Sequence, residues 1–176
     1  MKTPTKATAH SVYDLNYHIV LVTKYRHRVL EGDINQFVEE QVPTICQRYG
    51  WECLALGVMP EHVHLLVSEP DIANIATVIG VLKQITSRQL KQHREAFWET
   101  RYHDRNVFTP HVFRQKLRYL HRNPVARGLV TRPEDWPWSS YSHSLTGVPG
   151  AVEFESWWTE MARKGVSAWA PAKGRE

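Results

Sequence analysis

Two short apolar runs, residues 52–59 and 62–68, are separated only by Pro60 and Glu61. Two strand-length runs on either side of a short turn sequence predict an antiparallel hairpin. The second run opens with His62 and continues as a strand whose side chains alternate between two faces. This hairpin is the feature that most limits the possible folds, and it places a sheet at the middle of the chain.

Strand and helix patterns precede the hairpin. Residues 16–23 alternate as a strand does, with both faces partly apolar. Residues 33–49 carry apolar side chains at helical spacing, with Asp33 as the expected N-cap. Pro43 is expected to bend or divide this helix, and Gly50 to close it.

Three further elements follow the hairpin. The sequence predicts an amphipathic helix with a basic side over 73–92 and a shorter strand around 97–107. A helix over 110–123 has Thr109 as its N-cap, and Pro124 is expected to end it.

The resulting order is β-α-β-β-α-β-α, which predicts an α+β fold. It matches a ferredoxin-like sandwich, an antiparallel sheet with helices packed on one face, plus an extra C-terminal helical segment. We expect one domain over residues 1–145. A tail over 146–176 is expected to contain a short helix, after a turn-rich aromatic segment that begins near residue 133.

Composition excludes several classes of protein. The chain has 176 residues and 42% hydrophobic content, which suits one domain. Its apolar runs are too short to cross a bilayer, and no apolar leader follows the first residues. The two cysteines, Cys46 and Cys53, form no C-x-x-C pair, so neither a disulfide framework nor a thiolate metal site is indicated. A soluble, cytoplasmic protein is expected.

Basic residues are concentrated in one part of the sequence. Residues 97–132 hold eight basic and two acidic side chains, a net charge of +6 against −2 for the rest of the chain. A polyanion such as nucleic acid is the natural partner of such a segment. A solvated helix face is the alternative.

His62 and His64 lie two residues apart on a strand, so both imidazoles occupy one face. Such a pair can bind a divalent cation and leave positions open for a third ligand and for substrate oxygens. The H-x-H pattern is weak by itself, because ten histidines in 176 residues produce roughly 0.6 such triplets by chance. An ordinary polar strand edge is the alternative.

The helix over 110–123 adds a second group of polar side chains. Tyr119 and Asn123 are four residues apart and share a face away from the apolar stripe. Asn123 offers a carboxamide oxygen to a hard cation. A free phenol is about 0.1% ionised at pH 7, and cationic neighbours such as Lys116 and Arg122, or a metal ion, would favour the reactive form. A half-buried tyrosine and a C-terminal capping asparagine are the alternatives.

Together these residues resemble a known family. His62 and His64 within "MPEHVHLLV", with Tyr119 and Asn123 within "YLHRNPVARGLV", are similar to the single-tyrosine HUH transposases. "FWETRYHDRNV" and "RPEDWPWSSY" resemble the REP-associated tyrosine transposases of bacteria. "YHIVLVTKYRHRVL" is more similar to transposases of small insertion sequences. The resemblance covers about residues 11 to 145.

The resemblance implies a role for each matching residue. His62, His64 and Asn123 would bind Mg²⁺ or Mn²⁺, and Tyr119 would be the nucleophile. The implied reaction is cleavage and rejoining of single-stranded DNA beside a hairpin, through a 5′-phosphotyrosine. The protein would act as a monomer or homodimer, without a membrane and without a nucleotide cofactor.

Cationic and aromatic side chains are candidate DNA contacts. Trp136, Trp138 and Tyr141 would stack on bases or, alternatively, cap the core. The candidate phosphate contacts are Lys24, Arg26, Arg28, Lys83, Arg88, Lys116, Arg118, Arg122 and Arg127.

Two other functions stay open on sequence grounds. One is a domesticated, non-catalytic DNA-hairpin-binding protein, and the other is a metal-dependent hydrolase in which Tyr119 has no role. A covalent protein–DNA adduct would distinguish the transposase from both.

Overall fold

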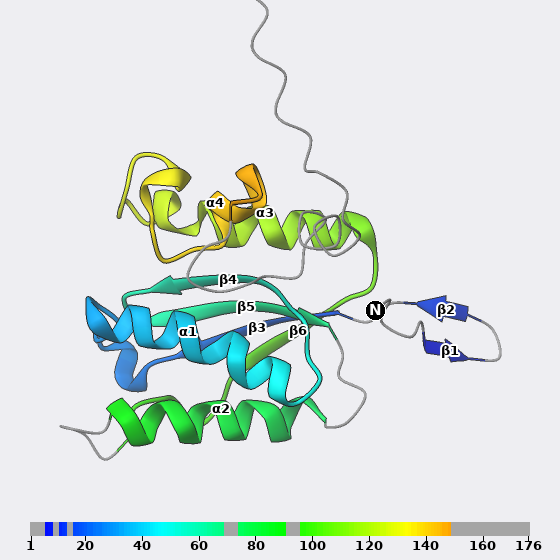
Figure 1. Cartoon of the computed structure of the whole chain (residues 1–176), viewed down its shortest axis with the longest axis horizontal. Coiled ribbons are helices and arrows are strands. Elements are labelled where there is room, and N and C mark those ends of the chain that lie inside the picture. Colours follow the sequence, from blue (N-terminus) through cyan, green and yellow to red (C-terminus); the bar gives the residue numbers. More distant parts are fainter. Residues whose placement is uncertain (1–5, 9–10, 14–15, 69–73, 91–95, 149–176) are drawn as a thin grey trace, which may run out of the picture.

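A four-stranded antiparallel sheet forms the middle of the protein (Figure 1). The computed structural model describes residues 6–8, 11–13, 16–68, 74–90 and 96–148. The strand order is β4-β5-β3-β6. The strands are β3 (Asn16–Val22), β4 (Cys53–Met59), β5 (His62–Ser68) and β6 (His103–Val107).

The predicted hairpin is present as β4 and β5. Met59 pairs with His62 across the Pro60–Glu61 turn, and the ladder continues to Val67. Strand β3 then pairs with the other edge of β5, which sets Val20 opposite His64. With β6 antiparallel to β3, this is the predicted ferredoxin-like order.

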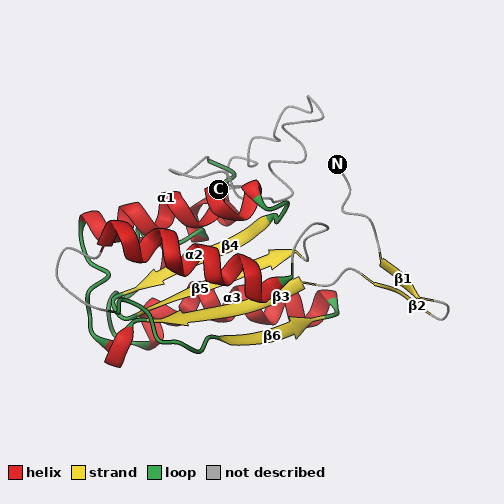
Figure 2. Cartoon of the chain, turned by 90° about the horizontal axis from the view of Figure 1, so that it is seen from below, coloured by secondary structure: helices red, strands yellow, loops and turns green. Residues whose placement is uncertain are grey.

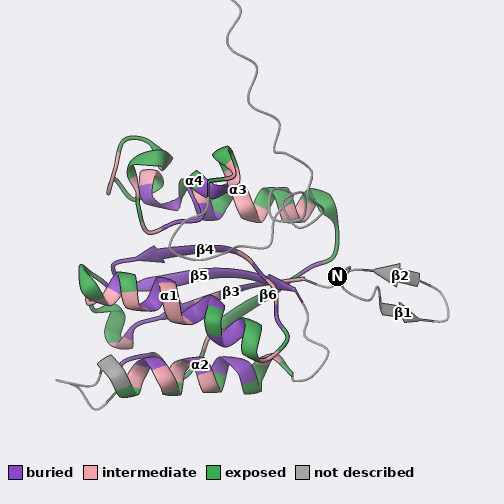
Figure 3. Ribbon diagram, viewed as in Figure 1, coloured by how far each residue is buried: buried purple, intermediate pink, exposed green. Residues whose placement is uncertain are grey.

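Helices cover both faces of the sheet (Figures 1 and 2). α1 (Asp33–Arg48) and α2 (Ile75–Leu90) form the predicted layer on one face, and α3 (Pro110–Ala126) crosses the other face. Strands β4 and β5 are almost wholly buried between these layers and β3 is mostly buried, whereas the edge strand β6 is exposed except at Val107 (Figure 3). Side chains of the larger core, under α1 and α2, include Ile19, Leu21, Val63, Leu65, Val67, Val38 and Ile79.

A smaller core joins α3 to the sheet. It is built from Ala55, Leu66, Val107 and Leu120. Gly57 permits the close approach of the helix, because a Cβ at this position would lie 3.0 Å from Leu120 Cδ2. The missing side chain therefore helps to set how near α3 lies to the strands.

The structure corrects one proline prediction and part of another. Pro43 lies inside α1 and does not divide it, because the helix runs from residue 33 to 48. Pro124 does not end α3, which continues to Ala126. A proline removes one helical N–H donor, but the bonds around Pro124 persist: Arg127 N–H donates to the Asn123 carbonyl at 3.0 Å, and Leu129 N–H to the Pro124 carbonyl at 2.9 Å.

The predicted strand around 97–107 is shorter than expected. Trp98 makes an isolated antiparallel bridge to Thr23, but β6 begins only at residue 103. The Lys83 ammonium donates to the carbonyls of Glu99 and Thr100, at 2.8 and 3.1 Å. The Lys83 side chain therefore donates to two carbonyls that would have accepted hydrogen bonds from a neighbouring strand if β6 had begun earlier.

Short elements complete the described residues. β1 (Lys6–Thr8) and β2 (Ser11–Tyr13) form a separate two-stranded sheet that the sequence patterns had not indicated. η1 (Lys24–Arg26) follows β3, and η2 (Pro133–Asp135) and α4 (Tyr141–Thr146) form the turn-rich aromatic segment. The expected terminal helix lies outside the described residues. Within the described ranges, no helix is both long and apolar enough to span a membrane.

Candidate functional site

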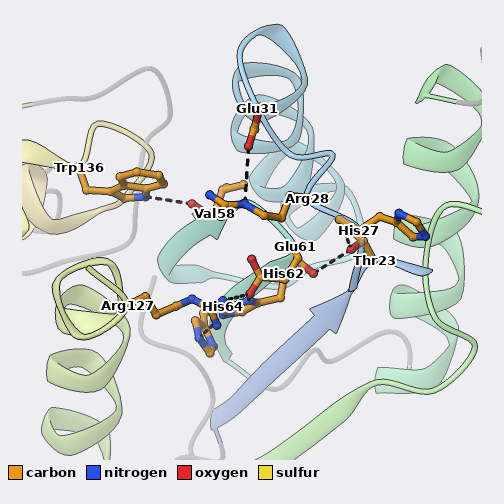
Figure 4. Close-up of polar contacts among 10 residues, drawn as sticks. All are labelled: Thr23, His27, Arg28, Glu31, Val58, Glu61, His62, His64, Arg127 and Trp136. Atoms are coloured by element: carbon orange, nitrogen blue, oxygen red, sulfur yellow. Dashed lines mark hydrogen bonds and ion pairs between the residues drawn. The ribbon is translucent and has the colours of Figure 1, made fainter. Parts of the chain in front are cut away.

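His62 and His64 lie on the face of β5 that α3 covers. Their strand neighbours Val63 and Leu65 belong to the core on the opposite face, as the alternation predicted. Both histidines are buried, and their Nε2 atoms lie 3.1 Å apart with the rings nearly perpendicular, at 87°. The two imidazoles converge on one point (Figure 4).

A carboxylate fixes the orientation of His62. Its Nδ1–H donates to Glu61 Oε1 at 3.0 Å, and the same oxygen is ion-paired with Arg127, which follows α3 (Figure 4). Glu61 is only 4% exposed. This bond leaves the Nε2 lone pair of His62 free to bind a cation, the arrangement seen around many metal-ligating histidines.

A third histidine, His18 of β3, completes the cluster. Its Nε2 lies 3.2 Å from His64 Nδ1, and the two rings stack with centroids 5.2 Å apart and 19° between their planes. The pairing of β3 with β5 places His18 opposite Leu66 and therefore on the same face as His64. His18 is buried as well.

Tyr119 of α3 stands over this cluster. Its ring is edge-on to His64 with 5.4 Å between centroids, and edge-on to His18 with 6.2 Å. The side chain is 53% exposed. A phenol that contacts the histidines and yet faces solvent can be reached by an external substrate.

Asn123 is buried one turn further along α3. Its side-chain oxygen has no hydrogen-bond partner among the described residues, although buried acceptors are normally satisfied. The alternative that Asn123 is the C-terminal cap is wrong, because α3 continues for three more residues. The cap is Arg127, whose backbone N–H donates to the Asn123 carbonyl. An unpaired buried oxygen fits a missing ligand such as a cation.

The two histidine nitrogens also fit a cation. Neighbouring ligands at right angles, each about 2.1 Å from a metal, lie about 3.0 Å apart, which is close to the 3.1 Å between the Nε2 atoms. Within the described ranges no group of three or more His, Cys, Asp or Glu side chains could hold a metal ion. A third protein ligand here would therefore be a group of another type.

The surroundings keep the histidines neutral. Burial lowers the pKa of His64 well below its usual value, and the neighbouring His62 and His18 lower it further. Burial lowers the pKa of His62 despite the opposing Glu61 carboxylate. Burial, with the charges of Lys116 and Arg105, lowers the pKa of His18 to about 4. Neutral imidazoles are the form that binds metal ions.

Some of the predicted cationic residues gather near the site. Lys116 on α3 and Arg26 after β3 lie near enough for their charges to lower the pKa values of His64 and His62, after burial and nearer groups. Tyr25 and Arg26 adopt left-handed backbone angles, with φ of 55° and 53°. Arg127 is ion-paired with Glu61, the carboxylate that orients His62.

Other predicted DNA contacts lie elsewhere or already have partners. Lys83 and Arg88 belong to α2, on the opposite face of the sheet from Tyr119. Lys24 is ion-paired with Glu99 at 3.2 Å, and Arg28 lies 3.9 Å from Glu31. The structure therefore places Lys83 and Arg88 away from Tyr119, whereas Lys24 and Arg28 each have an acidic partner.

The outer side of α3 lines a basic groove of about 630 Å³. Arg114, Arg118 and Arg122 recur every four residues along it, and no ion pair of theirs is seen within the described part of the chain. A second groove of about 580 Å³ lies between β6 and α3 and is lined by Arg105, Lys116 and the 55% exposed Phe108, among others.

The predicted aromatic residues have structural partners. Trp136 Nε1–H donates to the Val58 carbonyl at 2.9 Å (Figure 4), and Trp138 packs against the larger core. Tyr141 is edge-on to His121. These contacts match the core-capping alternative.

Sequence patterns had given no role to His18 or Glu61. His18 had a weak signal, since it is a polar residue inside an otherwise apolar strand. Its place beside His64 depends on strand pairing, which the pattern does not specify. Glu61 appeared only as part of the turn.

Comparisons with known proteins place the chain in a family. A family model described as "Transposase IS200 like" matches residues 11–118. The chain is 34% identical over 91 residues to the ISDra2 transposase TnpA of Deinococcus radiodurans, covering 49% of this chain and 65% of that protein, less than two thirds of its length. It is 31% identical over 143 residues to a Haemophilus influenzae protein named as a REP-associated tyrosine transposase, covering 73% and 81% of the two chains.

Solved structures show the same fold. A REP-associated tyrosine transposase bound to a REP hairpin superimposes with a TM-score of 0.66, 17% identity and coverage of 97% of this chain and 99% of that chain. A crystal structure described as a transposase of Deinococcus radiodurans gives a TM-score of 0.51, 31% identity and coverage of 66% and 96%. On the family match and the Haemophilus relative, the chain belongs to the IS200-like transposase family.

Proposed function

We propose that this protein is a metal-dependent tyrosine transposase that cleaves and rejoins single-stranded DNA next to a hairpin. One observation carries the proposal: a half-exposed phenol, Tyr119, contacts His64, whose Nε2 converges with that of His62 in a buried pair of neutral imidazoles. Family membership and the names of the relatives support the transposase activity. The match to a hairpin-bound transposase supports the fold that this activity needs.

Tyr119 is the proposed nucleophile. Its phenol oxygen attacks the phosphorus in line, the bond from phosphorus to the 3′-oxygen breaks, and a 5′-phosphotyrosine forms. The phenol proton passes to solvent, and the departing 3′-oxygen takes a proton from solvent. One phosphodiester replaces another, so a different 3′-hydroxyl can reverse the step and join the strands.

His62, His64 and Asn123 are the proposed ligands of Mg²⁺ or Mn²⁺. When bound, the cation stabilises the charge that develops on the phosphate oxygens. The chain's own part is to keep both imidazoles neutral through burial and to orient His62 through Glu61. Asn123 supplies a buried oxygen that is otherwise unpaired among the described residues.

The basic surfaces beside Tyr119 are the proposed DNA contacts. Arg118 and Arg122 line the groove on the outer side of α3, and Lys116 lines the groove toward β6. A strand whose phosphate reaches Tyr119 passes between these cations. A single strand meets this geometry more readily than a duplex, because its backbone can turn toward one fixed phenol.

A covalent adduct is the test. The protein is incubated with Mn²⁺ and a 3′-end-labelled single strand that contains a hairpin, and the products are separated on a denaturing gel. We expect a labelled protein–DNA species. A hydrolase would cut the strand without an adduct, and a non-catalytic hairpin binder would shift the DNA on a native gel without cutting it.

A further inference from the structure

His18 is the one histidine of the cluster that the proposed mechanism leaves without a role. It is 4% exposed and lies on β3, a strand that contributes none of the proposed ligands. Its ring nevertheless contacts a proposed metal ligand and the proposed nucleophile: it stacks on His64 and lies edge-on to Tyr119. A residue in this place can hold a ligand and the nucleophile in one arrangement.

The chemistry of His64 requires a hydrogen-bond partner. For His64 Nε2 to carry the lone pair that binds a cation, the ring proton must be on Nδ1, where a neutral imidazole keeps its single N–H. The atom that faces Nδ1 is His18 Nε2, at 3.2 Å. Glu61 performs the same task for His62, where it accepts the Nδ1–H bond at 3.0 Å.

We propose that His18 is a positioning residue: its Nε2 accepts the Nδ1–H bond of His64, which turns His64 Nε2 toward His62 and holds the ring under Tyr119. The two ligand histidines are thus oriented by different acceptors, a carboxylate for His62 and an imidazole for His64. Acceptors of this kind typically change metal affinity 10- to 100-fold. The inference rests on the metal site of the proposed function.

Matched variants of His18 separate the hydrogen bond from packing. His18→Gln places an amide oxygen at about the reach of imidazole Nε2, so it keeps an acceptor. His18→Phe keeps a flat ring for stacking on His64 but removes the acceptor, and His18→Leu is a second variant without one. Thermal unfolding of each protein shows whether the fold is retained.

Mn²⁺ affinity of the protein without DNA, measured by calorimetry, is the first readout. We expect His18→Phe to bind Mn²⁺ at least about 10-fold more weakly than the unaltered protein, and His18→Gln to stay within about threefold. Equal affinity in the unaltered protein and the folded Phe or Leu variant would overturn the role of His18 and leave the metal site standing. A folded Gln variant that loses as much affinity as Phe would also overturn it.

The second readout needs no substitution. Nitrogen-15 NMR of the histidine rings in the Mg²⁺-loaded protein reports which ring nitrogen carries the proton. We expect the proton of His64 on Nδ1. A proton on Nε2 in the loaded protein would overturn the proposal, and failure of the unaltered protein to bind either cation would overturn both this inference and the metal site.

Discussion

The ring of Tyr119 stands edge-on to that of His64, at 80° and with 5.4 Å between centroids. The two residues are 55 positions apart in sequence, and they meet because α3 lies close against β4 and β5. The contact joins the proposed nucleophile to a proposed metal ligand. Tyr119 can therefore be tested for the attack on phosphorus, and the metal ligands can be tested for cation binding.

Tyr119→Phe removes one hydroxyl and keeps the ring. Because the phenol oxygen is the atom that would bond to phosphorus, we expect the covalent adduct to fall at least about 10³-fold. Hairpin affinity, measured by fluorescence anisotropy, should change less than about threefold. An adduct of normal yield in the Phe variant would remove Tyr119 from the reaction.

Asn123→Leu tests the unpaired buried oxygen. A buried acceptor without a partner costs about 1 to 3 kcal/mol, so the apolar variant should be no less stable than the unaltered protein in chemical denaturation. Its Mn²⁺ affinity should fall at least about 10-fold, because a ligand is lost. Asn123→Asp keeps an oxygen and should bind Mn²⁺ at least as tightly as the unaltered protein. A clearly destabilised Leu variant with normal Mn²⁺ affinity would point to a structural role.

Gly57→Ala tests the spacing between α3 and the sheet. The added Cβ would lie 3.0 Å from Leu120 Cδ2 in a fully packed region, so we expect a loss of about 1 to 3 kcal/mol in the free energy of unfolding. Leu120→Ala removes the atoms that the new Cβ meets. In a double-mutant cycle, the two changes together should therefore cost less than the sum of each alone. Strict additivity would show that the helix accommodates the methyl group without strain.

The sequence alone was sufficient to predict the elements that depend on short-range patterns. The β4–β5 hairpin and the shared face of His62 and His64 follow from an alternation of two residues, and the start of α3 follows from Thr109 and Pro110. The predicted end of α3 at Asn123 was wrong, because the loss of one N–H donor at Pro124 did not end the helix. Local sequence rules give the free-energy cost of placing a residue such as proline in a helix. Tertiary packing determines whether the fold tolerates that cost.

The rest of the site depends on contacts between distant segments. His18 reaches His64 through the register of β3 against β5, and Glu61 meets Arg127 only because α3 ends above the hairpin turn. Lys83 looked like a phosphate contact, yet its ammonium is held by backbone carbonyls of residues 99–101. Charge along the sequence does not reveal which face of the sheet a cation will occupy.

Arg118→Ala and Arg88→Ala compare the two faces directly. Arg118 lines the groove on α3, and Arg88 is exposed on α2 behind the sheet. We expect Arg118→Ala to weaken hairpin binding and to lower the slope of log affinity against log salt by about 1, because one phosphate contact is lost. Arg88→Ala should leave both quantities unchanged in the same metal-free titration. The opposite pattern would place the DNA on the α2 face.

Glu39→Gln tests a buried carboxyl far from the nucleophile. Burial on α1, with the charge of Glu40, raises the pKa of Glu39 from 4.5 to about 7. Well below pH 4.5 the carboxyl is protonated in both the folded and the unfolded state, so it costs nothing. As the pH rises from 4.5 to 7, the unfolded state releases its proton first, and folding becomes progressively less favourable.

Glu39→Gln should therefore raise the free energy of unfolding by about 1 to 3 kcal/mol at pH 8 and by almost nothing at pH 4.5. Urea denaturation of both proteins at the two pH values measures the difference. Glu31→Gln, at an exposed side chain, is the matched control and should show no comparable pH-dependent gain. A gain of the same size at both pH values would mean that packing of the amide, and not loss of the charge, stabilises the variant.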